Sequence, residues 1–578
     1  MLSIMKKYMK PYTLLLLIVV ALVSVQVITD LYLPTLNADI INNGIAKGNT
    51  DYIWQKGLIM LAYAVLIGAC ALSASYFAAR GSMAFGRDLR SAVFKKVMSF
   101  SQQDIDKFST PSLITRTGND VQQVQMAAFF IQRIMLMAPI QMVGGIILAL
   151  RQDVELSWTL VVALPLMLAI VGVVLFFSLP LFMQSQTKLD RLSQVMREKL
   201  AGVRVIRAFV RTGYEKKRFD EANADQANLQ RKINRIMSTM MPFMNVIFNM
   251  TMLSILYFGA RRMDSASNPL EMGNLTAFLS YAMQIMFSVL MAVMMFVMLP
   301  RAAASATRIK AVLDTQPSIT DAPGLTSPRL DMAKGIRFDG VSFRYPGAEA
   351  DVLSGISFTA LPGQTVAVIG PTGSGKSTLA ALIPRFYDTT GGDIYIGGVK
   401  LRDIPLSDLR SRIGLVPQKA FLFTGSVFDN LRYGSEDAAD DELWAALDAA
   451  QASDFVREMP EGENSLITQG GSNVSGGQRQ RLAIARALVG SRDILVFDDS
   501  FSALDFKTDA LLREALRPIL KTRCALIVAQ RVSTIMDADL IIVLDEGEIS
   551  GMGRHGELMK SCATYREIVV SQLGRDAV

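Results

Sequence analysis

The stretch that decides the fold of the carboxy-terminal half is Thr365-Val366-Ala367-Val368-Ile369 followed by Gly370-Pro371-Thr372-Gly373-Ser374-Gly375-Lys376-Ser377. An apolar run before G-x-x-x-x-G-K-[ST] predicts a strand, a phosphate-binding loop and a helix. The glycines let backbone N–H groups converge on a phosphate, and the helix directs its positive N-terminal end at the same anion. The residues expected to bind a nucleotide here are Gly370, Thr372, Gly373, Ser374, Gly375, Lys376, Ser377 and Thr378.

A second apolar run, at residues 494–497, ends in Asp498 and Asp499. A buried strand that ends in a carboxylate is the expected metal-side partner of a phosphate-binding loop. We therefore expect Asp498 and the Ser377 hydroxyl to hold Mg²⁺. Short β-like runs alternate with helix-like segments over residues 335–578, which predicts an α/β domain with a largely parallel sheet.

The amino-terminal half is much more apolar. Of the 578 residues in the chain, 51% are hydrophobic and 19% are charged, and the charged share is below the roughly 25% of soluble domains. Six apolar segments are long enough to cross a bilayer as helices, namely 13–34, 57–79, 127–150, 158–181, 240–259 and 275–299. We expect an all-α domain of six transmembrane helices over residues 1–315, joined by a linker at 316–334 to the α/β domain.

The distribution of Lys and Arg predicts how the six helices are oriented. Basic residues gather in two long connections, at 80–126 and 184–238, whereas the connection between the third and fourth segments is short. Both long connections and both termini are therefore expected in the cytosol, in a multi-pass protein of the cytoplasmic (inner) membrane. Both connections are compatible with helix, so we expect the membrane helices to continue about 25–30 Å into the cytosol.

The amino terminus could also be taken for a signal peptide, because Lys6, Lys7 and Lys10 precede the first apolar segment. No Ala-x-Ala-like cleavage site closes that segment, and five further apolar segments follow. We therefore expect a retained first membrane helix. The net charge of +7 is expected to face anionic lipid.

Two features of the apolar segments leave alternatives open. Asp30 lies either at the outer interface of the membrane or in a polar substrate cavity. Methionine is abundant in the fifth and sixth segments and serves either plain packing or an adaptable surface for apolar ligands. The methionines concerned are Met237, Met240, Met241, Met244, Met250, Met252, Met283, Met286, Met291, Met294, Met295 and Met298.

Metal chemistry based on cysteine or histidine is not expected. Cys70, Cys524 and Cys562 share no ligand spacing, and His555 is the only histidine of the chain. We expect His555 to have a structural role.

Other motifs resemble those of ATP-binding-cassette (ABC) transporters. Asn473-Val474-Ser475-Gly476-Gly477-Gln478 resembles the family's signature sequence, with Val474 in place of the usual leucine. Tyr345 resembles the aromatic residue that stacks on adenine, and Gln418 the glutamine that contacts Mg²⁺ and faces the membrane domain. The segment Ser502-Ala503-Leu504-Asp505 resembles the loop that crosses to the partner domain. The resemblance covers the whole chain, six spans and then one cassette, in the order of an exporter half-transporter.

The resemblance implies an ATP-hydrolysing translocase with ATP and Mg²⁺ as its cofactors. Two cassettes are expected to dimerise head to tail. Each ATP then lies between the phosphate-binding loop of one subunit and Ser475, Gly476, Gly477 and Gln478 of the other. The two cytoplasmic connections are expected to end in short helices that dock on the cassettes, near residues 102–108 and 211–215.

Two residues depart from the family pattern. Asp499 stands where the family usually has a glutamate, and its carboxylate falls back by about 1.5 Å, roughly one C–C bond. A general base must approach its proton to about 2.6–3.2 Å, directly or through a water. Gln530 stands where the family usually has a histidine, and a glutamine can donate a hydrogen bond but cannot become a cation. We therefore expect a degenerate site that binds ATP and hydrolyses it slowly.

These features together predict one subunit of a heterodimeric, ATP-driven exporter of amphipathic or hydrophobic compounds, drugs among them. The expected partners are a second ABC half-transporter subunit with intact catalytic residues, membrane lipid, and a small hydrophobic or amphipathic substrate. Nucleic acid is not expected as a partner, because soluble nucleic-acid ATPases with such a signature lack six spans. The alternatives are a lipid, peptide or siderophore transporter on the same fold, and a regulatory ATP-binding membrane protein that transports nothing.

Overall fold

The computed structural model describes residues 1–264 and 270–574, which form two compact units. Unit 1 consists of Met1–Val97 and Pro111–Thr315, and unit 2 of Met98–Thr110 and Gln316–Val578. Unit 2 is thus built from two separate stretches of chain. The short stretch 98–110 comes from the first predicted cytoplasmic connection.

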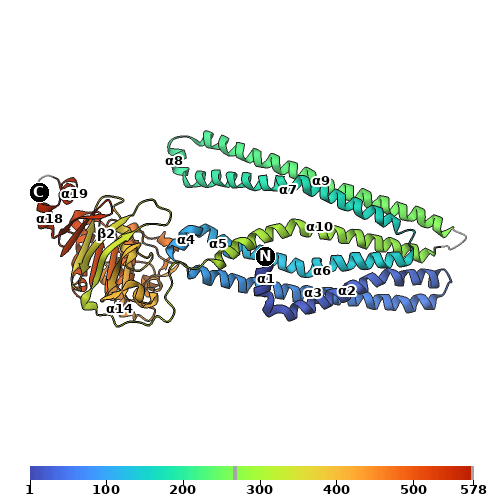
Figure 1. The fold of residues 1–578 in the computed structure, drawn as a ribbon, viewed down its shortest axis with the longest axis horizontal. Helices are drawn as coiled ribbons and strands as arrows, with labels where there is room; N and C mark the ends of the chain where they lie inside the picture. The colour runs from blue at the N-terminus through green and yellow to red at the C-terminus, as the bar shows by residue number, and fades with distance from the viewer. Residues whose placement is uncertain (265–269, 575–578) are drawn as a thin grey trace. The chain divides into compact units, whose positions relative to one another are not determined.

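Unit 1 is all-α, and its helices carry the six predicted membrane segments (Figure 1). Within the described residues, six helical stretches are long and apolar enough to cross a membrane, so the prediction of six transmembrane helices is confirmed. The helix α3 has 49 residues, or about 70 Å at 1.5 Å per residue, which is more than twice the thickness of a bilayer core. The helices are α1 (Leu2–Met9), α2 (Thr13–Asp39), α3 (Thr50–Met98), α5 (Thr110–Thr115), α6 (Val121–Gln152), α7 (Trp158–Ala201), α8 (Val203–Ala208), α9 (Thr212–Met263) and α10 (Met272–Asp314), with a 3₁₀ turn at Lys10–Tyr12 and π-helical turns at Ile40–Ile45 and Arg116–Asp120.

Apolar cores hold the described helices of unit 1 together. One core joins α2, α3, α6 and α10 and includes Leu160 of α7 and Ile255 of α9, and another joins α7 and α9 with part of α10. Figure 1 shows α7 and α9 running side by side, with α8 at the turn between them. A glycine permits close approach in the first core, because a Cβ at Gly145 would lie 2.7 Å from Cγ1 of Ile285.

The position of the second short cytoplasmic helix was predicted wrongly. The structure places it at α8, Val203–Ala208, whereas Arg211 and the residues after it start the long helix α9. The chain turns at Val210, whose φ of 54° lies in the left-handed region and separates the two helices. The first short helix, α4 (Gln102–Phe108), lies where it was predicted.

The structure gives partial answers on the two open features of the membrane segments. Gln141 of α6 donates to Oδ2 of Asp30 over 3.3 Å, so the carboxylate faces a neighbouring helix. Met244, Met286 and Met295 are buried in the packing, which favours the packing interpretation for these three. Other methionines, including Met250 and Met283, are exposed on unit 1, and the side chain of Met294 lies outside the described residues.

Unit 2 contains the predicted α/β domain. Its six-stranded sheet has the order β12-β11-β3-β10-β9-β6 and is parallel except for β12. Alternate residues of β3 enter two different cores, Ala367 one and Val366 the other, as expected for a parallel sheet covered on both faces. The strands are β12 (Glu548–Gly553), β11 (Leu540–Asp545), β3 (Thr365–Ile369), β10 (Cys524–Val528), β9 (Ile494–Asp498) and β6 (Ile413–Val416).

The rest of unit 2 surrounds this sheet. A four-stranded antiparallel sheet has the order β2-β1-β4-β5, and a two-residue pair joins β7 and β8. These strands are β1 (Ile336–Phe343), β2 (Leu353–Ala360), β4 (Gly391–Ile396), β5 (Val399–Lys400), β7 (Gly425–Ser426) and β8 (Leu466–Ile467). The helices are α4 (Gln102–Phe108), α11 (Lys376–Leu382), α12 (Leu406–Ser411), α13 (Val427–Arg432), α14 (Asp440–Ala449), α15 (Ser453–Arg457), α16 (Gly476–Leu488), α17 (Phe506–Leu520), α18 (His555–Ser561) and α19 (Ala563–Leu573).

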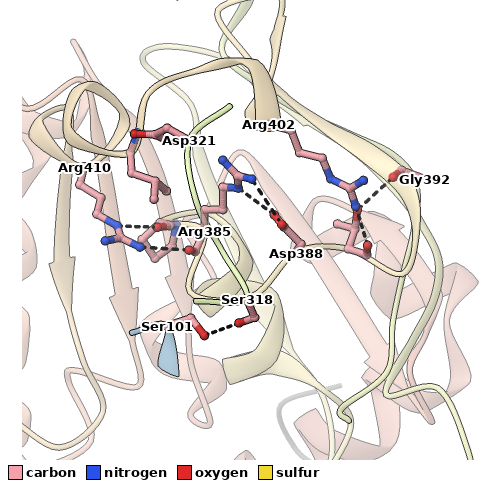
Figure 2. Close-up of polar contacts among 11 residues, drawn as sticks. Ser101, Ser318, Asp321, Arg385, Asp388, Gly392, Arg402 and Arg410 are labelled. Atoms are coloured by element: carbon pink, nitrogen blue, oxygen red, sulfur yellow. Dashed lines mark hydrogen bonds and ion pairs between the residues drawn. The ribbon is translucent and has the colours of Figure 1, made fainter. Parts of the chain in front are cut away.

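Helix α4 is fastened to the linker inside unit 2 by one buried carboxylate. Oδ2 of Asp104 accepts from the backbone N of Ser101 and of Ser318, each over 3.0 Å, and from both hydroxyls. Figure 2 shows the Ser101 and Ser318 hydroxyls bonded to each other, 2.6 Å apart. Burial raises the pKa of Asp104, but the hydrogen bonds from Ser318 and Ser101 outweigh it and lower the pKa overall.

We expect Asp104→Asn to free the linker from α4 and to cost about 2 kcal/mol of stability, because the lost bonds end on a charged acceptor. The measurement is the unfolding temperature in lipid nanodiscs, together with the rate of tryptic cleavage at Arg329 and Lys334 in the linker. The lowered pKa means that the wild-type contribution persists at neutral pH and is lost only as the pH falls through the lowered folded-state pKa of Asp104.

The control for this prediction is Asp106→Asn on the same helix. Asp106 is exposed and accepts from Tyr387 over 3.3 Å and from Gln102 over 3.0 Å, two contacts that an asparagine oxygen can still accept, so a cost below about 0.5 kcal/mol is expected. Equal effects of the two substitutions would contradict the role assigned to Asp104.

Candidate nucleotide-binding site

The predicted site residues follow strands that are neighbours in the six-stranded sheet. The phosphate-binding loop follows β3, Gln530 follows β10, Asp499 follows β9 and Gln418 follows β6. The carboxyl ends of parallel strands lie at one edge of a sheet, and ligands of such sheets bind there. The topology therefore gathers residues that are far apart in the sequence.

The phosphate-binding loop has the backbone that its glycines predict. Gly373 and Gly375 have φ values of 90° and 95°, in the left-handed region that only glycine adopts readily. A Cβ at Gly373 would meet no heavy atom within 4 Å, so the space beside the loop is open at this position. Nζ of Lys376 donates to the carbonyls of Gly370 and Pro371 over 2.9 and 2.7 Å, and burial lowers its pKa.

Two oxygen ligands lie together beside this loop. The Ser377 hydroxyl, in the first turn of α11, donates to Oδ1 of Asp498 at the end of β9 over 2.9 Å. Burial raises the pKa of Asp498, and the charge of Asp499 adds to it, while the bond from Ser377 lowers it. A hydroxyl and a carboxylate at this spacing fit the hard oxygen chemistry of Mg²⁺.

Asp499 lies next to this pair and is only 8% exposed. Gln418 donates from Nε2 to Oδ2 of Asp499 over 3.3 Å. The φ of Asp499 is 47°, a left-handed conformation that aspartate tolerates better than most residues. Its carboxylate is therefore held beside Gln418 at the carboxyl edge of the sheet.

Gln530 is exposed at the end of β10, but its backbone is held by a residue that the sequence did not point to. Gln572 of α19 donates from Nε2 to the carbonyl of Gln530 over 2.7 Å and accepts from the N of Val532 over 2.8 Å. The side chain of Gln572 thus binds the backbone both at Gln530 and two residues after it. Gln572 lies 42 residues later in an unremarkable helical stretch, so no sequence pattern identified it.

The aromatic end of the site is formed by Tyr345. Its hydroxyl lies 3.1 Å from Oγ1 of Thr378 in α11, and its ring packs edge-on against that of Tyr387, with the centroids 5.3 Å apart. His555 lies elsewhere in the fold, with Nδ1 2.8 Å from the Tyr565 hydroxyl, as a structural role predicts.

The signature residues are arranged separately from the phosphate-binding loop. Ser475 caps α16, because its hydroxyl accepts from the N of Gln478 while Oε1 of Gln478 accepts from the N of Ser475. Gly476 is exposed at this N-terminus. Within residues 1–264 and 270–574, no hydrogen bond or ion pair joins Ser475 or Gln478 to the phosphate-binding loop.

A charged residue inside the membrane segments was also overlooked. Arg133 of α6 falls within the predicted segment 127–150 and donates to the hydroxyl of Ser75 in α3. A charge in a long apolar run was a signal that the sequence offered, because such residues are costly in a bilayer.

Comparisons with known proteins agree with this layout. The sequence family described as "ABC transporter transmembrane region" matches residues 15–289, and the family described as "ABC transporter" matches residues 353–502. An uncharacterized ABC transporter ATP-binding protein of Mycobacterium tuberculosis (strain CDC 1551 / Oshkosh) is 41% identical over 99% of this chain and 98% of its own length. The chain belongs to the ABC transporter family.

Other ABC transporters show the same end-to-end similarity. An ATP-dependent lipid A-core flippase of Chromobacterium violaceum is 30% identical over 97% of this chain and 95% of its own length. A solved structure described as a bacterial Atm1-family ABC exporter with ATP bound superposes with a TM-score of 0.80, covering 100% of this chain and 99% of that one at 23% identity. This chain therefore has the fold of an ABC exporter, a membrane domain followed by an ATPase domain.

Proposed function

We propose that this ABC transporter chain is one subunit of a heterodimeric, ATP-driven exporter of amphipathic or hydrophobic compounds in the cytoplasmic membrane, with both termini in the cytosol. Its own nucleotide site binds ATP with Mg²⁺ and hydrolyses it slowly, while its signature residues complete the hydrolytic site of the partner. The observation that carries this proposal is that Asp499 and Gln530, the two departures from the family pattern, both occur at one nucleotide site, whereas the phosphate-binding loop, Ser377 and Asp498 keep that pattern.

Nucleotide binding is supported by the geometry of the loop and its neighbours. Lys376 would supply a positive charge for the outer phosphates. Ser377 and Asp498, which are hydrogen-bonded to each other, would hold Mg²⁺ together with Gln418, which lies beside Asp499. The metal would neutralise charge on the phosphates and hold them in place. Tyr345 offers a ring for stacking against adenine.

Slow hydrolysis is supported by the side chain of Asp499. Its carboxylate ends one methylene short of where a glutamate would end, and it is engaged by Gln418 over 3.3 Å. At the second position, the exposed Gln530 presents a neutral carboxamide. Both changes weaken activation of a water while leaving the phosphate contacts untouched.

A second subunit is supported by apolar surface in the cytoplasmic part of unit 1. Around α8, Val205, Phe209 and Val210 are 60%, 74% and 85% exposed, although they lie outside the apolar spans. Exposed apolar clusters of this kind mark protein contacts. The separation of Ser475 from the phosphate-binding loop likewise suits a site that two chains share.

A lipid is the second candidate cargo. Relatives at 30–33% identity are named lipid A-core flippases, and Arg133 offers a cation within a membrane helix for an anionic headgroup. A panel of drugs, lipids and peptides added to the subunit pair in nanodiscs would separate the two cargo classes by their stimulation of the ATPase.

The experiment that tests the proposal compares the purified chain alone with the chain co-purified with its partner. We expect the chain alone to hydrolyse ATP at no more than about a hundredth of the rate of the pair, because general base catalysis contributes about 10²–10⁴ in rate. Hydrolysis by the chain alone at the rate of a complete transporter would overturn the heterodimer.

A further inference from the structure

Helix α4 and the first strands of unit 2 line a cleft of about 690 Å³ beside Tyr345. Its volume lies in the range of small-molecule sites, about 300–1,000 Å³. Gln103 is the residue of α4 that faces this cleft, and the opposite lining includes Arg344, Tyr345 and Asp388. One side chain of the first cytoplasmic connection therefore borders the space next to the aromatic ring.

The other polar side chains that line the cleft already have partners. Arg344 donates from Nε to Oδ1 of Asp351 over 2.8 Å. Figure 2 shows Asp388 turned toward Arg385, whose Nε donates to its Oδ1 over 2.7 Å.

Thr390 is engaged in the same way, since its hydroxyl donates to the carbonyl of Ser342 over 3.0 Å. Among the described residues, 1–264 and 270–574, no hydrogen bond engages the carboxamide of Gln103. Gln103 therefore keeps both its donor and its acceptor for a ligand.

The placement of Gln103 is fixed from two sides. The hydroxyl of Tyr387 donates to Oδ2 of Asp106 on α4 over 3.3 Å, and the ring of Tyr387 packs against Tyr345. On the other side Asp104 binds the linker residue Ser318. Gln103 directly precedes Asp104 on the same helix, so these two anchors fix the backbone from which its side chain borders the cleft beside Tyr345.

We propose that Gln103 is a specificity-determining residue that recognises the N6/N7 edge of adenine in the nucleotide bound beside Tyr345. This inference rests on the proposed function, ATP binding by this chain. A carboxamide accepts from the N6 amino group with Oε1 and donates to N7 with Nε2. Guanine presents O6 and N7, two acceptors, so Oε1 would face O6 and one bond would be lost. The residue that selects the base belongs to the connection that leads to the membrane helices.

The test measures binding of AMP-PNP and GMP-PNP with Mg²⁺ to the full-length chain in lipid nanodiscs, by titration calorimetry. For the wild-type chain we expect AMP-PNP to bind about tenfold more tightly than GMP-PNP, the lower end of what a bidentate base contact discriminates. Gln103→Ala is expected to reduce this ratio to about one. Gln103→Arg is expected to invert it in favour of GMP-PNP, because a guanidinium donates to both O6 and N7.

Gln102→Ala is the matched control, because Gln102 is exposed on the same helix and its carboxamide donates to Asp106 over 3.0 Å. This variant is expected to keep the wild-type ratio. Failure of AMP-PNP to bind the wild-type chain would overturn the proposed function. Normal AMP-PNP binding with a ratio that neither Gln103 variant changes, or that Gln102→Ala changes equally, would overturn only the role of Gln103.

Discussion

The double substitution Asp499→Glu/Gln530→His is expected to raise the ATPase rate of the full-length chain in nanodiscs about one hundredfold, in line with what a well-placed general base contributes. The longer glutamate moves the carboxylate forward by about 1.5 Å. The histidine adds a group that can carry positive charge near the outer phosphate. Steady-state phosphate release at saturating Mg·ATP gives the rate, and ATP binding is expected to stay unchanged because Lys376, Ser377 and Asp498 are untouched.

The control variants test whether the rate depends on the length and charge of the side chain at position 499. Asp499→Asn keeps the length and removes the charge, so no gain in rate is expected. Each single substitution is expected to recover only part of the rate, since the two groups act on one transition state. Rates are compared at equal dimer content, because the proposed function has the signature residues of a second chain complete the site. A dimer of the double variant that hydrolyses ATP no faster than wild type would contradict the assignment of a degenerate site.

Arg308→Ala is expected to destabilise unit 1 by about 2–3 kcal/mol, because it removes the counter-charge of a buried carboxylate. The side chain of Asp120 is 3% exposed, and Nε of Arg308 donates to its Oδ2 over 2.8 Å. We place the cost below that of a fully buried pair because the Arg308 side chain is 48% exposed. The measurement is the unfolding temperature in nanodiscs, with a fall of about 5 °C or more expected.

Lys310→Ala provides the comparison on the same helix. Its ion pair with Asp314 is 3.9 Å long and exposed on both sides, so a change below about 0.5 kcal/mol is expected. Adding Asp120→Asn to Arg308→Ala removes the unpaired charge and is expected to recover part of the loss. Equal effects of Arg308→Ala and Lys310→Ala would contradict the role assigned to the buried pair.

Local pattern predicted most of the fold. The six apolar segments were visible because a bilayer demands long uninterrupted apolar helices, and the strand at 365–369 because apolar residues precede a glycine-rich loop. The geometry of Ser377 and Asp498 follows from the same logic, since β3 and β9 both run parallel to β10 between them and end at the same edge of the sheet.

Other features depend on contacts between distant residues and left no local signal. The turn at Val210 follows α8 and has a left-handed backbone conformation. Because β-branched residues rarely adopt this conformation, the sequence did not predict a turn there. Gln572 lies in an ordinary helical stretch and Gln103 in the short helix predicted at 102–108, and only the folded chain brings these two side chains to Gln530 and Tyr345. Side chains that act through tertiary contact were therefore missed, whereas those in local motifs were found.

The two-part composition of unit 2 has a consequence for biosynthesis. Asp104 lies 214 residues before its linker partner Ser318, and Asp106 lies 281 residues before Tyr387. At ribosomal rates of about 5–20 residues per second, Ser318 is synthesised roughly 10–40 s after Asp104. Helix α4 must remain undocked and soluble during that interval, while the third to sixth membrane helices are being inserted. A translation pause within residues 111–315 would prolong this exposure and so increase the chance that chaperones or proteases capture the chain.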